Sequence, residues 1–314
     1  MNRRLAILAL TEKYKLSAQH HAEIKRLAGI GQQPAALSQH LQTGIAVLAA
    51  ALGGLGLLFW VAANWQLLSS GSRFALLEIV LTVALLGAWL RPAARLPLSL
   101  LGFIACGSML AHFGQTYQTG ADPWQLFALW AALTLPLCFS VRHDALWMAW
   151  AIVALTAAVL FSSIVPGRTL LHSSLGSWVP AIALAAAFRF VPGTGAWPMR
   201  LCMIYATMGL SWVAFVSLFD DKDYGYYLLT LLSIAALAYA FCLRKLFDVF
   251  VISALGLGAN VLLIAGLIRL LAVSNSDLTT AAMLMIGCAA AALLAGTVKL
   301  IMYLARTYSG EDMA

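Results

Sequence analysis

The sequence predicts an all-α, polytopic helical membrane protein with about ten transmembrane helices and a short N-terminal cytoplasmic helical segment. The first observation is composition, since 62% of the 314 residues are hydrophobic and only 10% are charged. A soluble domain carries about 25% charged residues, because its surface faces water. The second observation is a succession of apolar stretches of about 20 residues, the length that a helix needs to cross the hydrocarbon of a bilayer.

Ten such stretches follow one another, and nearly every break between them is marked by Pro, Gly or charged residues. The expected spans are 44–63, 74–90, 98–113, 125–141, 145–165, 174–191, 201–219, 226–243, 248–272 and 279–304.

The chain divides into three expected parts. Residues 1–43 form a cytoplasmic amphipathic helical segment, in which Ser17 is a suitable N-cap. Residues 44–306 form the transmembrane bundle, and residues 307–314 form a cytoplasmic tail.

The distribution of the 19 Lys and Arg residues gives the orientation. With the N-terminus in the cytoplasm, only Arg73, Arg168 and Lys222 lie in outer segments, and Arg269 lies within a span. All the others lie in inner segments or at inner span ends. Because cytoplasmic loops carry an excess of Lys and Arg, we expect a bacterial inner-membrane protein with both termini cytoplasmic.

The cysteines and the net charge of the chain limit which cofactors and partners we expect. The five Cys all lie in apolar stretches without metal-ligand spacing, so we expect buried small side chains and no metal or cofactor. The net charge of +7 is spread over short loops and forms no basic stripe, which argues against a nucleic-acid partner. Membrane lipids are the expected partners, and the sequence leaves the oligomeric state open.

One polar and aromatic stretch interrupts the apolar pattern: "HFGQTYQTGADPWQLFALW", residues 112–130. We expect residues 112–124 to form the wall of an outward-facing pocket, with Asn64 and Trp65 opposite. Gln115 and Gln118 are three residues apart and would share one helix face, while Tyr117 would point elsewhere. Two other interpretations stay open. The aromatic side chains can form an interfacial belt, and the Gln side chains can tie helix ends together.

Three further residues stand out within the spans. Glu78 and Arg269 lie at similar expected depths near the outer interface, which suggests an ion pair. The alternatives are snorkelling of the Arg269 side chain and, for Glu78, an interfacial carboxylate near Arg73. Asn260 follows Gly256 and Gly258 near the middle of a span. This pattern is typical either of a discontinuous helix that lines a substrate site or of close helix packing with an interhelical hydrogen bond.

The candidate ligand-binding residues are therefore spread over several spans, and no catalytic residues are assigned. They are Asn64, Trp65, Glu78, Gln115, Tyr117, Gln118, Asp122, Asn260 and Arg269.

Two stretches resemble a bacterial multi-pass membrane family, domain of unknown function 2157. They are "LGGLGLLFWVAANW", followed by a short loop and Arg73, and "GQTYQTGADPWQLFALWAALTLP". The segment "KLSAQHHAEI" is similar to the short cytoplasmic helix that precedes the first span in that family. The resemblance covers about residues 10–140 and implies a fold and a location, but no activity and no catalytic residues.

The sequence leaves three functions open. The first is a transporter-like or solute-binding permease for a small polar solute, in which ten spans would divide into two inverted halves of five. The alternative is an envelope-facing sensor or assembly factor that binds a lipid, a glycan or a protein. A membrane enzyme is less favoured, because His112, His172, Asp122 and Glu78 show no spacing that makes them converge. A polar path through the bundle would favour transport, and polar groups confined to the outer rim would favour binding.

Overall fold

The computed structural model describes residues 17, 20, 23–24, 35–64, 67–118, 120–164, 170–219, 224–243, 246–274 and 280–311. Within these ranges the chain is helical and contains no β-strand. Of the expected N-terminal helix before Ala35, the structure describes Ser17, His20, Glu23 and Ile24. The backbone N–H of His20 donates to Ser17 Oγ at 3.4 Å, as expected for an N-cap at Ser17. The all-α fold predicted from the sequence is confirmed.

Ten α-helices correspond one to one with the ten expected spans in the described part of the chain. They are α3 (Ala35–Ala63), α4 (Ser70–Leu90), α5 (Arg95–Tyr117), α6 (Pro123–Val141), α7 (Asp144–Ile164), α8 (Leu170–Ala187), α9 (Trp197–Phe219), α10 (Tyr224–Cys242), α11 (Val249–Ser274) and α12 (Thr280–Glu311). A short 3-10 helix, η1 (Pro92–Ala94), precedes α5.

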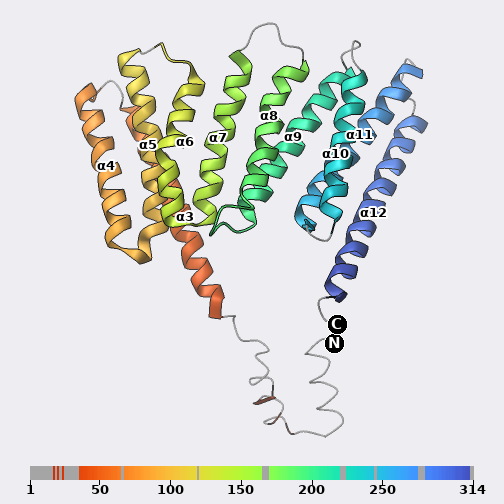
Figure 1. Ribbon diagram of the computed structural model, residues 1–314, viewed down its shortest axis with the longest axis horizontal. Helices are drawn as coiled ribbons and strands as arrows, with labels where there is room; N and C mark the ends of the chain where they lie inside the picture. Colours follow the sequence, from red (N-terminus) through yellow and green to blue (C-terminus); the bar gives the residue numbers. More distant parts are fainter. Residues whose placement is uncertain are drawn as a thin grey trace.

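Eight of these helices are long and apolar enough to cross a membrane, by length and composition, among the described residues. The other two, α3 and α8, contain shorter apolar stretches, Leu41–Leu57 and Trp178–Ala187. Successive helices alternate in direction, and most of them stand side by side in one row (Figure 1). The protein is therefore an integral membrane protein with multiple apolar helices.

The alternation gives the bundle two ends (Figure 1). We call the end with the α5–α6 turn the distal end. The other end carries the start of α3, the end of α12 and the α8–α9 loop, and we call it the terminal end. On the predicted topology the distal end would face away from the cytoplasm.

Two helices organise the packing. Helix α5 contacts α3, α4, α6 and α7, and α9 contacts α7, α8, α10 and α11. Each neighbour of α5 therefore corresponds to a neighbour of α9 that comes four helices later in the chain: α3 to α7, α4 to α8, α6 to α10 and α7 to α11. Because four is an even number, helices that correspond in this pattern run in the same direction. The packing does not follow the division into two inverted halves of five that a transporter plan suggested.

Buried aromatic side chains join the helices near the centre of the row. Trp147 of α7 is 2% exposed, and its ring lies edge-on to the rings of Phe139, Trp150 and Phe188. The indole N–H of Trp150 donates to the carbonyl of Ala131 at 2.8 Å. Such bonds satisfy a polar group that hydrocarbon cannot, and they fix α7 against α6.

Candidate functional site

The α5–α6 turn has a specific backbone geometry. Helix α5 is capped by Gln118, whose φ of 43° and ψ of 49° lie in the left-handed region, and Gly120 has a φ of 63°. Pro123 begins α6, because its fixed φ suits the first turn of a helix. Asp122 occupies the N-cap position, but its carboxylate makes no capping hydrogen bond. That carboxylate is exposed and stays available at the turn.

A pocket of about 660 Å³ lies between the distal ends of α5 and α6. Its lining combines polar groups at the turn with apolar side chains further along both helices. The lining residues are Leu110, Ala111, Phe113, Gly114, Gln115, Gln118, Gly120, Ala121, Asp122, Pro123, Gln125, Leu126 and Leu129. The structure thus brings Gln115, Gln118 and Asp122 to one concave surface.

Tyr117 points elsewhere, as expected from its position on the helix. It is 62% exposed and does not line the pocket. Its ring packs against Phe113 of α5 and Phe74 of α4, with centroid distances of 4.7 and 6.1 Å. Phe113 also lines the pocket, whereas Tyr117 and Phe74 form an aromatic rim beside it.

His112, directly below this rim, is buried between α4 and α5. It is 3% exposed and its ring lies 4.4 Å from the ring of Phe74. The hydroxyl of Thr116 lies 3.3 Å from Nδ1, and the carbonyl of Ser70 lies 3.5 Å from Nε2. His112 therefore ties the distal ends of α4 and α5 together, on the side away from the pocket lining.

The predicted opposite wall of the pocket is not among its lining residues. The Asn64 side chain donates from Nδ2 to the carbonyl of Trp60 at 2.9 Å, which closes the last turn of α3. Trp65 lies outside the described residues. Glu78 is exposed on α4 and also does not line the pocket.

The expected ion pair between Glu78 and Arg269 is wrong. Helices α4 and α11 stand towards opposite edges of the row (Figure 1). A guanidinium N–H of Arg269 instead donates to the hydroxyl of Tyr224 on α10 at 3.4 Å. Glu78 and Arg269 therefore lie on helices that are not neighbours.

Asn260 lies in a helix that is continuous from Val249 to Ser274. Thr297 of α12 donates from Oγ1 to Oδ1 of Asn260 at 3.1 Å. A Cβ added to Gly256 would lie 2.8 Å from Thr297 Cγ2, and one added to Gly258 would lie 2.7 Å from Thr207 Cγ2. The two glycines therefore allow α11 to approach α12 and α9 closely, and the discontinuous-helix interpretation is wrong.

The distal pocket, its turn and the helices that carry it all fall in the N-terminal half of the chain. Residues 9–147 match a family model described as predicted membrane protein (DUF2157). The resemblance to DUF2157 is confirmed. The match covers α3 to α6 and the start of α7, so the α5–α6 pocket lies wholly inside the part of the chain that is similar to DUF2157. No curated protein and no solved structure matches the chain.

The sequence did not point to the lining residues that lie outside the predicted wall, residues 112–124. Leu110, Leu126 and Leu129 look like ordinary span residues, because neither composition nor periodicity separates lipid-facing from pocket-facing side chains. Gln125 was missed as well. A signal existed for Gln125, which follows Pro123 by two residues and so lies in the first turn of α6.

Proposed function

We propose that the α5–α6 pocket binds an amphiphile with an uncharged or cationic headgroup, and that the protein acts as a membrane-embedded binding protein for a sensing or assembly role. The observation that carries this proposal is the division of the pocket lining. Gln115, Gln118 and Asp122 lie at the turn, while Leu110 and Leu129 lie further along the two helices. A ligand with a polar head and an apolar tail satisfies both parts at once.

The polar part of the lining favours a headgroup without a net negative charge. The Gln side chains supply amide donors and acceptors, which match hydroxyl groups well. Asp122 supplies the formal charge in the lining, and it is negative. A phosphate placed here would meet a carboxylate and no Lys or Arg among the lining residues. A glycolipid or an amine-bearing headgroup fits this chemistry better.

Orientation follows from the Lys and Arg distribution. With both termini in the cytoplasm of a bacterium, the distal end faces the outer side of the inner membrane. The pocket would then open to the outer leaflet. Its polar residues would lie among the lipid headgroups and its apolar residues among the acyl chains. This location suits a sensor or an assembly factor that binds lipids of the bacterial envelope.

Transport receives less support from the same features. Asn260, the polar group expected to mark a path, bonds to Thr297 inside a continuous helix. The distal pocket is lined by α5, α6 and their turn, whereas Asn260 faces α12 at the other side of the row (Figure 1). The polar groups of the pocket therefore do not continue to Asn260.

Photo-crosslinking in lipid nanodiscs tests the proposal. The full chain would be exposed to a photoactivatable glucosyl-diacylglycerol and, separately, to phosphatidylglycerol with the same photoactivatable acyl chain. We expect the glucolipid to label residues 110–129 more strongly than phosphatidylglycerol does. Soluble methyl glucoside should compete poorly, because it lacks the tail. Equal labelling by both lipids would contradict the proposal, as would strong competition by methyl glucoside.

Matched variants separate binding from folding. Gln115→Ala and Gln118→Ala each remove amide groups that are exposed in the pocket, so the protein should remain abundant while glucolipid labelling falls. Losing one neutral hydrogen bond costs about 0.5–1.5 kcal/mol, or roughly two- to tenfold in affinity. Gln42→Ala, an exposed Gln on α3, is the control and should leave labelling unchanged. If thermal stability falls in proportion to labelling, the Gln side chains are a structural clamp.

A further inference from the structure

The lining of the distal pocket includes an aromatic ring, that of Phe113 on α5. The Phe113 side chain is 48% exposed, so a ligand in the pocket can reach its ring. Two neighbouring rings support it from the side of the aromatic rim. The ring of Tyr117 lies 4.7 Å away, centroid to centroid, and the ring of Phe74 lies 6.4 Å away in an edge-on arrangement. Phe113 is therefore a supported ring with an accessible surface.

Along α5, Phe113 lies between the apolar and the polar parts of the lining. Leu110 precedes it by three residues, and Gln115 follows it by two. Both of these residues line the pocket as well. A ligand whose polar head lies at the α5–α6 turn, and whose tail runs along the helices, would therefore pass the Phe113 ring close to the junction of head and tail.

The polar part of the lining has the chemistry that suits hydroxyl groups. Gln115, Gln118 and Gln125 are exposed, and each carries an amide oxygen that accepts and an amide nitrogen that donates. An ammonium group only donates hydrogen bonds, so it leaves the three amide nitrogens without an acceptor. A hydroxyl both donates and accepts, so a group with several hydroxyls uses the amides fully and can also donate to the carboxylate of Asp122.

An aromatic ring adds a preference for one kind of polyhydroxyl group. A hexopyranose is a flat ring with hydroxyls around its edge and C–H bonds on its faces. The face of an aromatic ring carries partial negative charge, and it packs well against such weakly positive C–H groups. An accessible ring beside amide and carboxylate groups therefore matches both the faces and the edge of a sugar.

The end of α9 carries a similar pair of rings without this polar surrounding. Phe215 and Phe219 are four residues apart at the distal end of α9, and their centroids are 4.8 Å apart. Between them, Ser217 is fully buried, and its hydroxyl donates to a backbone carbonyl of the same helix. On α5 the corresponding residue is Gln115, which is exposed and lines the pocket. Helix α9 thus provides a matched control for Phe113.

We propose that the Phe113 ring stacks against a hexopyranose headgroup, so that the ligand of the distal pocket is a glycolipid. This inference rests on the proposed function, which leaves open whether the headgroup is a neutral sugar or an amine. Gln115 and Gln118 bind hydroxyls at the edge of the sugar, and Phe113 packs against one of its faces. The acyl chains lie against the apolar side chains further along the helices, among them Leu110 and Leu129.

The experiment compares three lipids that share the same photoactivatable acyl chain, each with the full chain in nanodiscs. Their headgroups are glucose, an open-chain gluconamide and a dimethylammonium-propane amine. We expect glucose to give the strongest labelling of residues 110–129, because the open chain keeps hydroxyls but has no flat face and the amine has no hydroxyls. Equal labelling by the gluconamide lipid would overturn the stacking. Stronger labelling by the amine lipid would overturn the sugar assignment but leave the proposed function standing. Labelling by none of the three would overturn both.

Three variants test the ring itself. Phe113→Leu keeps an apolar side chain but removes the ring, so it should lower labelling by the glucose lipid about fivefold and leave labelling by the gluconamide lipid unchanged. Phe113→Tyr keeps the ring and should label like wild type. Phe215→Leu, the matched control on α9, should leave all labelling unchanged. The proposal is overturned if Phe113→Leu has no effect, if it lowers labelling by all three lipids equally, or if Phe215→Leu acts in the same way.

Discussion

The hydroxyl of Thr297 on α12 donates to the side-chain oxygen of Asn260 on α11, at 3.1 Å. Asn260 is 6% exposed, so this bond joins two apolar helices at a position shielded from solvent. Helix α12 packs mainly on α11. The bond is therefore one of few directional contacts that fix the last helix of the bundle.

The first prediction is a measurable coupling between these two side chains. Asn260→Ala and Thr297→Val should each lower stability, and the double variant should lose less than the sum. Interhelical hydrogen bonds in membrane proteins contribute about 0.6 kcal/mol on average and up to about 1.7 kcal/mol. Reversible unfolding of the four proteins in mixed micelles measures the coupling. Strict additivity would show that the bond contributes nothing to stability.

The second prediction concerns the close approach of α11 to α9. In Gly258→Ala the new methyl group would lie 2.7 Å from Thr207 Cγ2 and 3.3 Å from Ser211 Oγ, so the helices must separate. Overpacking of this kind costs about 1–3 kcal/mol. Gly287→Ala on α12 is the matched control, because nothing lies within 4 Å of its added Cβ. Equal thermal stability of the two variants would contradict the close packing.

The third prediction separates the two roles of Asp248. Its Oδ2 accepts from Nε of Arg200 at 3.0 Å, and its Oδ1 accepts from the backbone N–H groups of Phe250 and Val251, which caps α11. Asp248→Asn removes the ion pair with Arg200 but keeps an oxygen that can cap α11, whereas Asp248→Ala removes both. A lost N-cap costs about 1 kcal/mol, and a partly exposed ion pair contributes about 0–1 kcal/mol. We therefore expect Asp248→Ala to lower the melting temperature more than Asp248→Asn. The reverse order would mean that the ion pair, and not the cap, dominates.

The fourth prediction concerns orientation. The α5–α6 turn and the end of α12 lie at opposite ends of the bundle (Figure 1). Reporter fusions at Gly120 and after Ala314 should therefore report opposite sides of the membrane, periplasm and cytoplasm respectively. Two reporters on the same side would contradict the helix alternation, and an exchange of the two sides would contradict the orientation drawn from Lys and Arg.

The number and order of the helices could be predicted because each span is a local property of the sequence. Pro123 marked the start of α6 to within two residues of the expected span, and the described part of α3 begins at Ala35, earlier than expected. The polar side of the distal pocket was also predictable, since Gln115, Gln118 and Asp122 come from one continuous stretch. Neither Asn64 nor Glu78 joined them, because membership of a pocket depends on which helices become neighbours.

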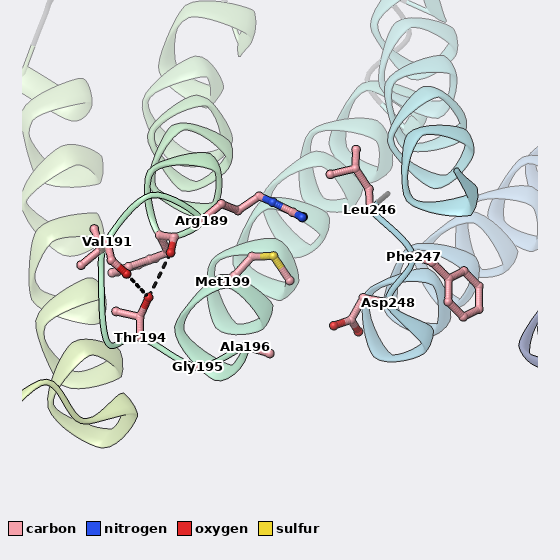
Figure 2. A pocket seen from close by; sticks show the side chains of 10 residues that line it. Arg189, Val191, Thr194, Gly195, Ala196, Met199, Leu246, Phe247 and Asp248 are labelled. Carbon is pink, nitrogen blue, oxygen red and sulfur yellow. Dashed lines mark hydrogen bonds between the residues drawn. The ribbon is translucent and has the colours of Figure 1, made fainter. Parts of the chain in front are cut away.

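Contacts between distant parts of the chain could not be predicted from depth alone. Glu78 and Arg269 were paired because they lie at similar depths, but α4 and α11 do not adjoin. The Arg200–Asp248 pair joins residues 48 positions apart, and no local pattern marks it. The α8–α9 loop and the segment that leads into α11 line one hollow although they are far apart in the sequence, so no local pattern marks its residues (Figure 2).

The most direct test of the distal pocket is to fill it without disturbing the fold. Gly114 lines the pocket, and nothing lies within 4 Å of a Cβ added there. Gly114→Trp should therefore fold normally and place an indole in the space that the ligand would occupy. Gly56→Trp on α3 is the matched control, since Gly56 is equally open but outside the pocket.

The deciding measurement is the photo-crosslinking yield of the glucosyl-diacylglycerol probe in nanodiscs, for wild type and these two variants at equal protein abundance and thermal stability. We predict that Gly114→Trp lowers the labelling of residues 110–129 at least tenfold, while Gly56→Trp matches wild type. Undiminished labelling in Gly114→Trp would show that the α5–α6 pocket is not the binding site.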